Sequence, residues 1–473
     1  MQFFRLFDLL YLTDDEKYFI IKGIFMNNSF LEFAKNRKLG FFGIGKTNIE
    51  LLSLLSGSGA EIALRSDEKV NSDMLPADLN ISAIFEGAES TEAITEDVLF
   101  FSPSVRRDRA EFLCALGRGT ALTSDVEFFL SHNDSPLFLV TGSDGKTTTA
   151  ILAERMLKTR GNAIAIGNVG RAATPFLKEK NTSFVLEASS FMLEYARPKS
   201  ERAVITSLTP DHLLWHGGYD NYKQTKMKAL DCAKERVATL DSPDLQEFIG
   251  KEKFFAITST TLSTKAMIRS HEADYYYSLE DGYITENGHR LIKLSDLKKR
   301  EDFNIRNYLS ALALTKSFGD EDKSLEIISD FSGIEHRGEI FLERRGVRFI
   351  NSSIDTSPQR TATTINGLGG ELILLLGGRD KGLDFSPLIK ALKGRVKTVL
   401  LFGESGEKIA EAIPDIINKK VFRYLDFATE YAMKIAEAGD TVLLSPAATS
   451  YDEFQDFEQR GRFFKNTVLQ SFR

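Results

Sequence analysis

The hydrophobic positions of this chain fall into short apolar runs, and each run leads through a Gly-containing turn into a stretch of helical periodicity. The segment "FLVTGSDGKTTTAILAERML" at 138–157 has this order, and so does "LGFFGIGKTNIELLSLL", which begins at Leu39. Further runs of strand length are "AEIAL", "DVLFFSP", "TSFVLEASSF", "RAVITSLTPDH", "ELILLLGG", "KTVLLFG", "KVFRYL" and "TVLLSP". Strands that alternate with helices in this way predict an α/β protein with parallel sheets.

The same rhythm predicts the domain organisation. At roughly 150 residues per domain, a chain of 473 residues should hold about three domains. We place them at residues 37–133, 134–332 and 333–473, with residues 1–36 as an N-terminal extension. Charged residues interrupt the apolar start, so we expect a surface helix or an idle extension rather than a signal peptide, with Met26 as an alternative start. The aromatic stretch near 271–300 predicts a hairpin.

Composition narrows the class of protein. The net charge is -7 with acids and bases interspersed, so no basic surface indicates a nucleic-acid partner. No apolar run reaches the ~18 residues of a membrane span. Cys114 and Cys232 form neither a disulfide framework nor a metal-ligand spacing, which fits a reduced compartment. We therefore expect a cytoplasmic protein without nucleic-acid or membrane partners. We also expect it to be a monomer.

The turn "TGSDGKTTT" carries the first candidate chemistry. Gly142 and Gly145 let backbone N–H groups approach an anion, and the helix that follows offers its positive end. Lys146 can reach terminal phosphates, and the Thr147 hydroxyl can bind Mg²⁺. The stretch departs from the general pattern G-x-x-x-x-G-K-[ST], because Val140 stands where the first Gly should be. The alternative is a strand, a turn and a helix with a surface lysine.

Three later residues add to this candidate site. Glu187 ends a predicted strand, where open α/β sheets bind ligands, and a carboxylate suits Mg²⁺. His212 follows another strand end, and Lys226 lies on the next predicted helix. Each has an ordinary alternative: Glu187 as a helix cap or surface acid, His212 as a structural histidine, and Lys226 on a solvated helix face.

Together, these pieces resemble the Mur ligase family of peptidoglycan synthesis, whose phosphate loop has the shortened form T-G-[TS]-x-G-K-[TS]. The resemblance begins near Leu39 and is greatest to the members that add D-glutamate. It depends on "TGSDGKTTT", "GNVG", "LEASSFMLE", "LTPDHLLWHG", "NYKQTK", "EHRGE", "LLLGGRDKGLDF" and "LSPAATSYDEFQDFEQRG". It implies Rossmann-like first and third domains and a central P-loop ATPase-like domain with a parallel sheet.

The resemblance also implies an activity and a set of nucleotide-site residues. The expected enzyme is an ATP-dependent ligase that adds D-glutamate to UDP-N-acetylmuramoyl-L-alanine through an acyl phosphate, in cytoplasmic peptidoglycan precursor synthesis. Arg337 would steady the transferring phosphoryl group, Asn304 and Asn307 would contact the adenine side, and Ser352 stands at the ribose position. Two Mg²⁺ sites would use Thr147, Glu187, His212 and a Lys226 carbamylated by CO₂. The ATP phosphates would contact Gly142, Ser143, Asp144, Gly145, Lys146, Thr147 and Thr148.

The substrate residues that the resemblance implies are spread over all three domains. Lys46 and Thr47 of the first domain would hold the uridine diphosphate. Asn168, Ser189 and His212 would contact the sugar-peptide. A dicarboxylate acceptor needs cations and hydroxyl donors, and the third domain would supply its pocket from Thr356, Lys381, Ser450, Tyr451 and Phe457.

Several positions depart from the family's pattern. Ser352 replaces an Asp at the ribose, Ser104 replaces a Gly, and Arg65 stands where many members have an Asp near the uracil. Such drift suggests a non-catalytic or altered-specificity nucleotide-binding protein as one alternative. A ligase similar to folylpolyglutamate synthetase, which shares the central domain and the carbamylated lysine, is the other. The phosphate and metal residues Lys146, Glu187, His212 and Lys226 are retained, which favours an active ligase.

Overall fold

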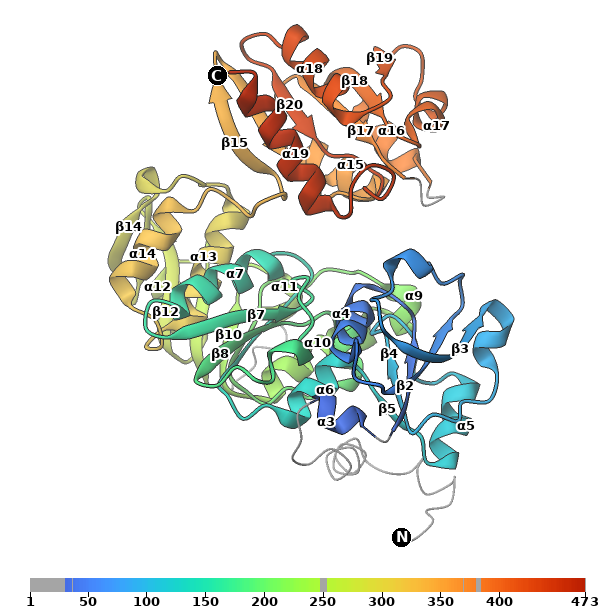
Figure 1. Cartoon of the computed structure of the whole chain (residues 1–473). Helices are drawn as coiled ribbons and strands as arrows, with labels where there is room; N and C mark the ends of the chain where they lie inside the picture. Colours follow the sequence, from blue (N-terminus) through green and yellow to red (C-terminus); the bar gives the residue numbers. More distant parts are fainter. Residues whose placement is uncertain (1–29, 36, 247–252, 369, 380–383, 473) are drawn as a thin grey trace. The chain divides into compact units, whose positions relative to one another are not determined.

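The strands that alternate with helices along the chain form three sheets. The computed structural model describes residues 30–35, 37–246, 253–368, 370–379 and 384–472. The chain divides into two compact units, Met1–Asp330 and Phe331–Arg473 (Figure 1). The first unit holds two of the sheets and the second unit holds the third. The predicted α/β class is confirmed, and one sheet lies within each of the three predicted domains.

The first sheet has the strand order β3-β2-β1-β4-β5, and all its pairings are parallel. Its strands are β1 (Lys38–Phe42), β2 (Glu61–Ser66), β3 (Asn80–Glu86), β4 (Val98–Phe101) and β5 (Ala121–Thr123). Its helices are α3 (Phe30–Ala34), α4 (Lys46–Leu55), α5 (Ala110–Arg118) and α6 (Asp125–His132).

Helix α3 corrects the predicted start of the first domain. Phe30 and Phe33 are only 5% and 3% exposed, and they pack into the core of the first sheet. The Phe30 ring meets Phe100 and Phe128 edge-on, with ring centroids 5.7 and 5.3 Å apart. The end of the predicted extension is therefore core structure. Residues 1–29, and with them Met26, lie outside the described residues.

The second sheet has the order β14-β13-β12-β11-β10-β9-β6-β8-β7. Pairings from β7 to β12 are parallel, and β12, β13 and β14 pair antiparallel, which confirms the predicted hairpin. Its strands are β6 (Leu137–Thr141), β7 (Asn162–Gly167), β8 (Thr182–Glu187), β9 (Ser200–Ile205), β10 (Ala233–Thr239), β11 (Phe254–Ser259), β12 (Ala273–Glu280), β13 (Tyr283–Glu286) and β14 (His289–Lys293).

Helices cover both faces of this sheet, as the burial of both faces of a parallel sheet requires. Leu137 and Leu139 point to the face that packs against α8 and α10, and the alternate residues Phe138 and Val140 point to the other face. The helices are α7 (Lys146–Leu157), α8 (Ser190–Tyr195), α9 (Leu213–His216), α10 (Tyr219–Asp231), α11 (Pro243–Gln246), α12 (Thr264–Ser270), α13 (Asp302–Thr315) and α14 (Glu321–Asp330). No helix among the described residues has the length and apolar character needed to cross a membrane.

The two sheets of the first unit are tied together by buried and partly buried hydrogen bonds. The Asp125 carboxylate, at the start of α6, accepts from the backbone N–H groups of Ala173 and Thr174 at 2.7 and 2.9 Å. Glu50 of α4 accepts from the N–H of Ala172 at 2.7 Å. These acceptors belong to the first sheet's helices, and the donors precede or begin the short 3₁₀ turn Thr174–Phe176 beside the second sheet.

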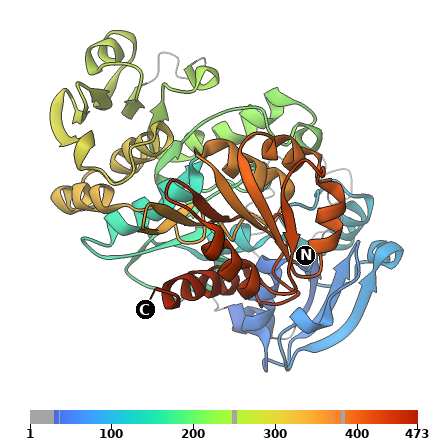
Figure 2. The same ribbon diagram turned by 90° about the horizontal axis from the view of Figure 1, so that it is seen from above.

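The second unit contains one sheet of order β15-β16-β20-β17-β18-β19, in which only β15 pairs antiparallel. Helices α15, α16 and α17 cover one face, and α18 and α19 cover the other. Figure 2 shows α19, in dark red, alongside the strands. The elements are β15 (Glu339–Arg344), β16 (Val347–Asn351), α15 (Pro358–Gly367), β17 (Leu372–Gly377), α16 (Ser386–Leu392), β18 (Val396–Phe402), α17 (Gly406–Ala412), β19 (Lys419–Val421), α18 (Leu425–Ile435), β20 (Thr441–Leu444) and α19 (Phe457–Gln470).

Candidate active site

The predicted phosphate loop joins the fully buried strand β6 to α7. Gly142 and Gly145 have φ values of +147° and +82°, which favour glycine. A Cβ on Gly142 would lie 2.2 Å from Thr206 Oγ1, and one on Gly145 would lie 2.2 Å from Asn307 Oδ1. Since Gly145 is the N-cap of α7 and brings no capping side chain, the positive end of this helix stays available to an anion.

Two lysines converge on this loop. The Lys146 ammonium donates to the carbonyls of Gly142 and Ser143 at 2.9 and 2.7 Å. The Lys226 ammonium, on α10, donates to the same Gly142 carbonyl at 2.8 Å. Lys226 is only 1% exposed, and burial, together with the charge of Lys146, lowers the pKa of its ammonium to about 7. A large part of Lys226 is therefore a neutral amine near neutral pH.

Glu187 ends β8 beside the loop, in parallel register with Val140. It is fully buried, and its Oε1 accepts from the Asn168 side-chain amide at 2.7 Å. Its Oε2 has no hydrogen-bond partner among the described residues. A buried carboxylate oxygen without a partner is costly unless a cation meets it. The donor set therefore fits Mg²⁺, which prefers hard oxygen ligands.

His212 and His216 lie on the neighbouring turn. His212 is exposed, caps α9 with a φ of +51°, and has its Nε2 3.3 Å from Asp211 Oδ2. Its ring lies 4.7 Å from that of Phe191. His216 is buried with its Nδ1 3.7 Å from Glu194, and burial lowers the pKa of its imidazole. The structure thus places the two histidines in different environments, one open and one packed.

Tyr222 is a residue of this site that our sequence analysis did not single out. Its hydroxyl lies 2.9 Å from Ser143 Oγ, and its ring lies under the Lys226 ammonium at 4.9 Å from the ring centroid. Burial raises the pKa of its hydroxyl to about 12, so it stays protonated. Tyr222 precedes Lys226 by four residues, and this spacing puts both on one face of α10 and could have revealed it.

The other predicted residues of the first unit have these positions. Asn307 accepts from Thr149 Oγ1 at 3.4 Å and borders Gly145, whereas Asn304 donates to Glu301, the N-cap of α13, at 2.8 Å. Ser189 caps α8 by accepting from the N–H of Met192. The loop before α7 contains Ser143 and Asp144, and the first turn of α7 contains Thr147 and Thr148. Helix α4 begins with Lys46 and Thr47, and the side chain of Lys46 is not among the described ones.

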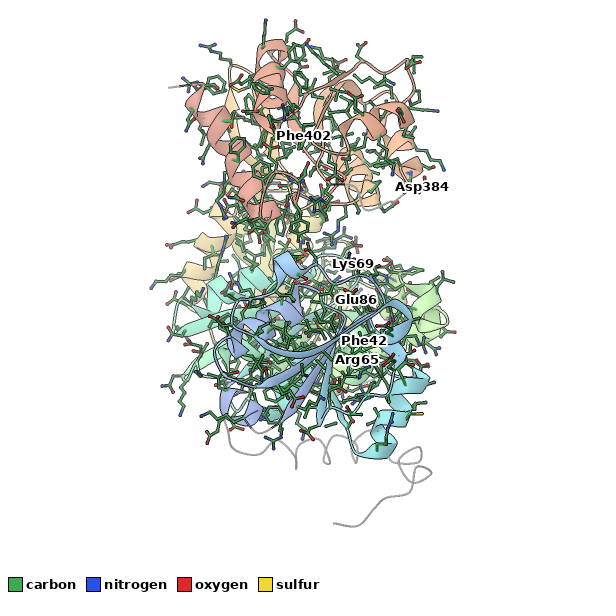
Figure 3. All side chains as sticks on the ribbon, turned by 45° about the vertical axis from the view of Figure 1, so that its right-hand side comes forward. Phe42, Arg65, Lys69, Glu86, Asp384 and Phe402 are labelled. Atoms are coloured by element: carbon green, nitrogen blue, oxygen red, sulfur yellow. The ribbon has the colours of Figure 1, made fainter. Side chains whose placement is uncertain are left out.

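Arg65, which stands at a predicted uracil position, is buried and held by the protein itself (Figure 3). Its Nε lies 2.9 Å from Glu96 Oε1. Its remaining N–H groups donate to the same carboxylate and to the carbonyls of Ser90, Glu92 and Ala93. The guanidinium of Arg65 therefore binds the loop before β4 and fixes it next to β2.

The remaining predicted residues belong to the second unit. Ser352 and Ser450 are 1% and 2% exposed, and they follow the neighbouring strands β16 and β20. Thr356 lies in the loop after β16, Tyr451 is about half exposed, and the Phe457 ring meets His336 edge-on at 6.2 Å. Arg337 is exposed. Lys381 lies outside the described residues.

Among the described residues, one group of His, Cys, Asp or Glu side chains has the spacing of metal ligands: Glu335, His336 and Glu339, with candidate ligand atoms within 4.8 Å of one another. The Lys465 ammonium already forms ion pairs with Glu335 and Glu339, at 3.1 and 2.5 Å. This cation offsets part of the charge on the two carboxylates, and the group is explained as an ion-pair cluster that holds α19 next to the start of the second unit.

Comparison with known proteins places these features in a wider context. Residues 140–315 match the Mur ligase middle domain, and residues 336–448 match the Mur ligase glutamate ligase domain. The UDP-N-acetylmuramoylalanine–D-glutamate ligase of Clostridium tetani is 31% identical over 94% of this chain and 99% of its own. The enzyme of the same name from Acetivibrio thermocellus is 33% identical over 93% of this chain and 98% of its own.

Two solved structures share the fold. The UDP-N-acetylmuramate–alanine ligase of Thermotoga maritima has a TM-score of 0.56 at 18% identity, over 92% of this chain and 100% of that one. A pseudomurein peptide ligase type C from Methanothermus fervidus has a TM-score of 0.50 at 15% identity, over 93% and 100%.

Proposed function

Because the chain belongs to the Mur ligase family, we propose that it joins D-glutamate to UDP-N-acetylmuramoyl-L-alanine at the expense of ATP. Relatives named for this activity match more than nine-tenths of the chain, which supports the whole reaction rather than one shared domain. We further propose that the enzyme acts as a cytoplasmic monomer in peptidoglycan precursor synthesis.

The observation that carries the proposal is the convergence of Lys146 and Lys226 on the Gly142 carbonyl beside the buried carboxylate of Glu187. This arrangement suits phosphoryl transfer, which requires positioning and charge neutralisation above all. The substrate carboxylate attacks the γ-phosphorus of ATP, which gives an acyl phosphate and ADP. The amine of D-glutamate then attacks the acyl carbon, and the tetrahedral intermediate collapses to an amide and phosphate.

Different residues of the chain would bind the ATP phosphates, the nucleoside and Mg²⁺. The phosphate-loop N–H groups and the Lys146 ammonium hold the phosphates of ATP, and Asn307 borders the same loop. Arg337 is assigned to the transferring phosphoryl group, and Ser352 and Asn304 to the nucleoside. Thr147, Glu187, His212 and Lys226 would hold Mg²⁺ at two sites. The ion, when bound, neutralises charge on the phosphate oxygens.

Lys226 has the chemistry needed for carbamylation. A neutral amine attacks the carbon of CO₂, loses a proton and becomes an anionic carbamate. With a pKa of about 7, roughly half of Lys226 is neutral at pH 7, against roughly one part in 3,000 for an ordinary lysine. The carbamate would convert a buried cation beside Glu187 into an oxygen ligand, which supports the proposed second metal site.

The substrate contacts are proposed by similarity and by residue chemistry. Lys46 and Thr47 would bind the diphosphate, and Asn168 and Ser189 the sugar-peptide. The acceptor pocket would use Thr356, Lys381, Ser450, Tyr451 and Phe457, whose cation and hydroxyls suit a dicarboxylate.

Phosphate release tests the proposal directly. Purified protein is given ATP, Mg²⁺, bicarbonate and UDP-N-acetylmuramoyl-L-alanine, with D-glutamate, L-glutamate, L-lysine or D-aspartate in turn. We expect release that requires D-glutamate and disappears in Lys146→Ala, while the exposed Lys234→Ala serves as the matched control. Folded protein that turns over none of these acceptors would refute the ligase assignment in favour of a non-catalytic protein.

A further inference from the structure

A single buried arginine joins three loops of the second unit. Arg460, on α19, is fully buried. Its Nε donates to Ser353 Oγ at 3.0 Å, and its Nη2 donates to the Ser353 carbonyl at 2.9 Å. Its Nη1 donates to the carbonyls of Ala448 and Gly377 at 3.1 and 3.4 Å. One planar guanidinium thus fixes three backbone segments that are far apart in sequence.

These segments leave three adjacent strands at the same edge of the sheet. Ser353 follows β16, Ala448 follows β20, and Gly377 ends β17, and the three strands are neighbours in the order β16-β20-β17. Ligands of open α/β sheets bind outside the carboxyl ends of the strands. Ser353 precedes Thr356 by three residues, and Ala448 precedes Ser450 by two, so Arg460 holds the backbone that carries both hydroxyls of the proposed acceptor pocket.

The packing around Arg460 leaves little freedom. A Cβ on Gly378 would lie 2.9 Å from Arg460 Nη1 and 2.0 Å from the Thr449 carbonyl. The backbones of Arg379 and Thr449 exchange hydrogen bonds at 2.9 and 3.0 Å, which ties the loop after β17 to the loop after β20. The N–H of Ala447 donates to the Asp355 carbonyl at 2.9 Å, which ties the loop after β20 to the loop after β16.

The charge of Arg460 is also unusual for a buried guanidinium. In the described part of the chain its hydrogen bonds go to three carbonyls and one hydroxyl, and none goes to a carboxylate. Asp452, Asp355 and Glu453 act on it only at longer range, and burial lowers the pKa of the guanidinium to about 9. A buried cation without a directly bonded carboxylate favours an anion near the loops that it holds.

We propose that Arg460 is a positioning residue for the acceptor amino acid: it sets the affinity for the dicarboxylate acceptor by holding the loops of Thr356 and Ser450 from behind. This inference rests on the proposed function. Arg460 contacts the backbone of the pocket loops, so it acts through them. Its loss should therefore affect the acceptor far more than ATP or the UDP-linked substrate.

Steady-state kinetics of Arg460→Met, Arg460→Lys and Ser353→Ala test this role. We expect the KM for D-glutamate to rise by ~10- to 100-fold in Arg460→Met, the scale for misplaced pocket groups, with the KM for ATP little changed. Arg460→Lys keeps the positive charge but loses the planar set of N–H donors. Its KM for D-glutamate should therefore lie between those of the wild type and Arg460→Met. Ser353→Ala removes only the hydroxyl that accepts a hydrogen bond from Arg460 Nε, so it should raise the KM for D-glutamate least. The exposed Arg462→Met on the same helix is the matched control.

Hydrogen exchange gives a second readout that does not depend on activity. In Arg460→Met, amides of residues 353–356, 377–379 and 447–451 should exchange faster, while those of α16 and α17 stay protected. A lower kcat with an unchanged D-glutamate KM, or faster exchange spread evenly over the unit, would overturn the proposal. If Arg460→Met does not fold, Arg460→Lys and Ser353→Ala decide by the same criteria. A wild type that turns over no acceptor refutes the proposed function and with it the effect on acceptor affinity, and the exchange pattern still decides whether Arg460 holds the three loops.

Discussion

Replacing Arg65 by Met should strongly destabilise the first unit. The side chains of Arg65 and Glu96 are each 1% exposed, and their charged atoms lie 2.9 Å apart. The replacement leaves a carboxylate buried without its cation and removes the donors of three backbone carbonyls. Loss of one partner from a buried ion pair costs about 3–5 kcal/mol, so we expect the free energy of unfolding to fall by that amount.

The single tryptophan provides the assay. Trp215 lies in the first unit, where its indole N–H donates to the Ser104 carbonyl at 3.3 Å, so its fluorescence follows the unfolding of this unit in urea. The matched control is Arg290→Met, whose partner Asp281 lies at 3.4 Å in an exposed pair, and it should change stability little.

A double replacement separates the ion pair from simple loss of packing. Arg65→Met combined with Glu96→Leu removes both charges, so it should be less destabilising than Arg65→Met alone. The reasoning fails if Arg65→Met costs less than about 1 kcal/mol, or if the two replacements simply add.

Three further predictions concern the candidate active site. Gly145→Ala should raise the KM for ATP and lower stability by about 1–2 kcal/mol or more, because a Cβ there meets Asn307 at 2.2 Å and the φ of +82° is strained; Gly161→Ala, which has open space, should be neutral by thermal unfolding. In CO₂-free buffer, Lys226→Met should be more stable than the wild type at or below pH 7, and this advantage should disappear towards pH 10.5. The folded-state pKa of Lys226 is about 7, so between these pH values only the unfolded wild-type chain holds the proton and wild-type stability rises with pH. A stability difference that does not change with pH would contradict this. Glu187→Gln should raise the Mg²⁺ concentration needed for half-maximal activity by roughly 10- to 100-fold, and an unchanged Mg²⁺ titration would remove Glu187 from the metal site.

The parts of the fold that depend on local sequence were predictable, and those that depend on distant contacts were not. Apolar runs and Gly turns identified most strands, because period and turn chemistry act within a few residues. The glycine turn between β6 and α7 was predicted for the same reason. The contacts of Arg460 were not predicted, because its partner Ser353 is 107 positions away in the sequence. The roles of Arg65 and of helix α3 likewise depend on side chains that only the fold brings close.

The hydrogen bonds of Asp125 and Glu50 determine where this chain can be recombined with its relatives. A crossover near residue 133 would pair one parent's acidic acceptors with the other parent's backbone at Ala172, Ala173 and Thr174. Any shift of that turn would then leave the buried Asp125 carboxylate and the partly buried Glu50 carboxylate without their donors. A crossover near residue 330 falls between the two compact units and keeps each set of acceptors with its own donors. Hybrid ligases that exchange acceptor specificity should therefore be built at the second junction.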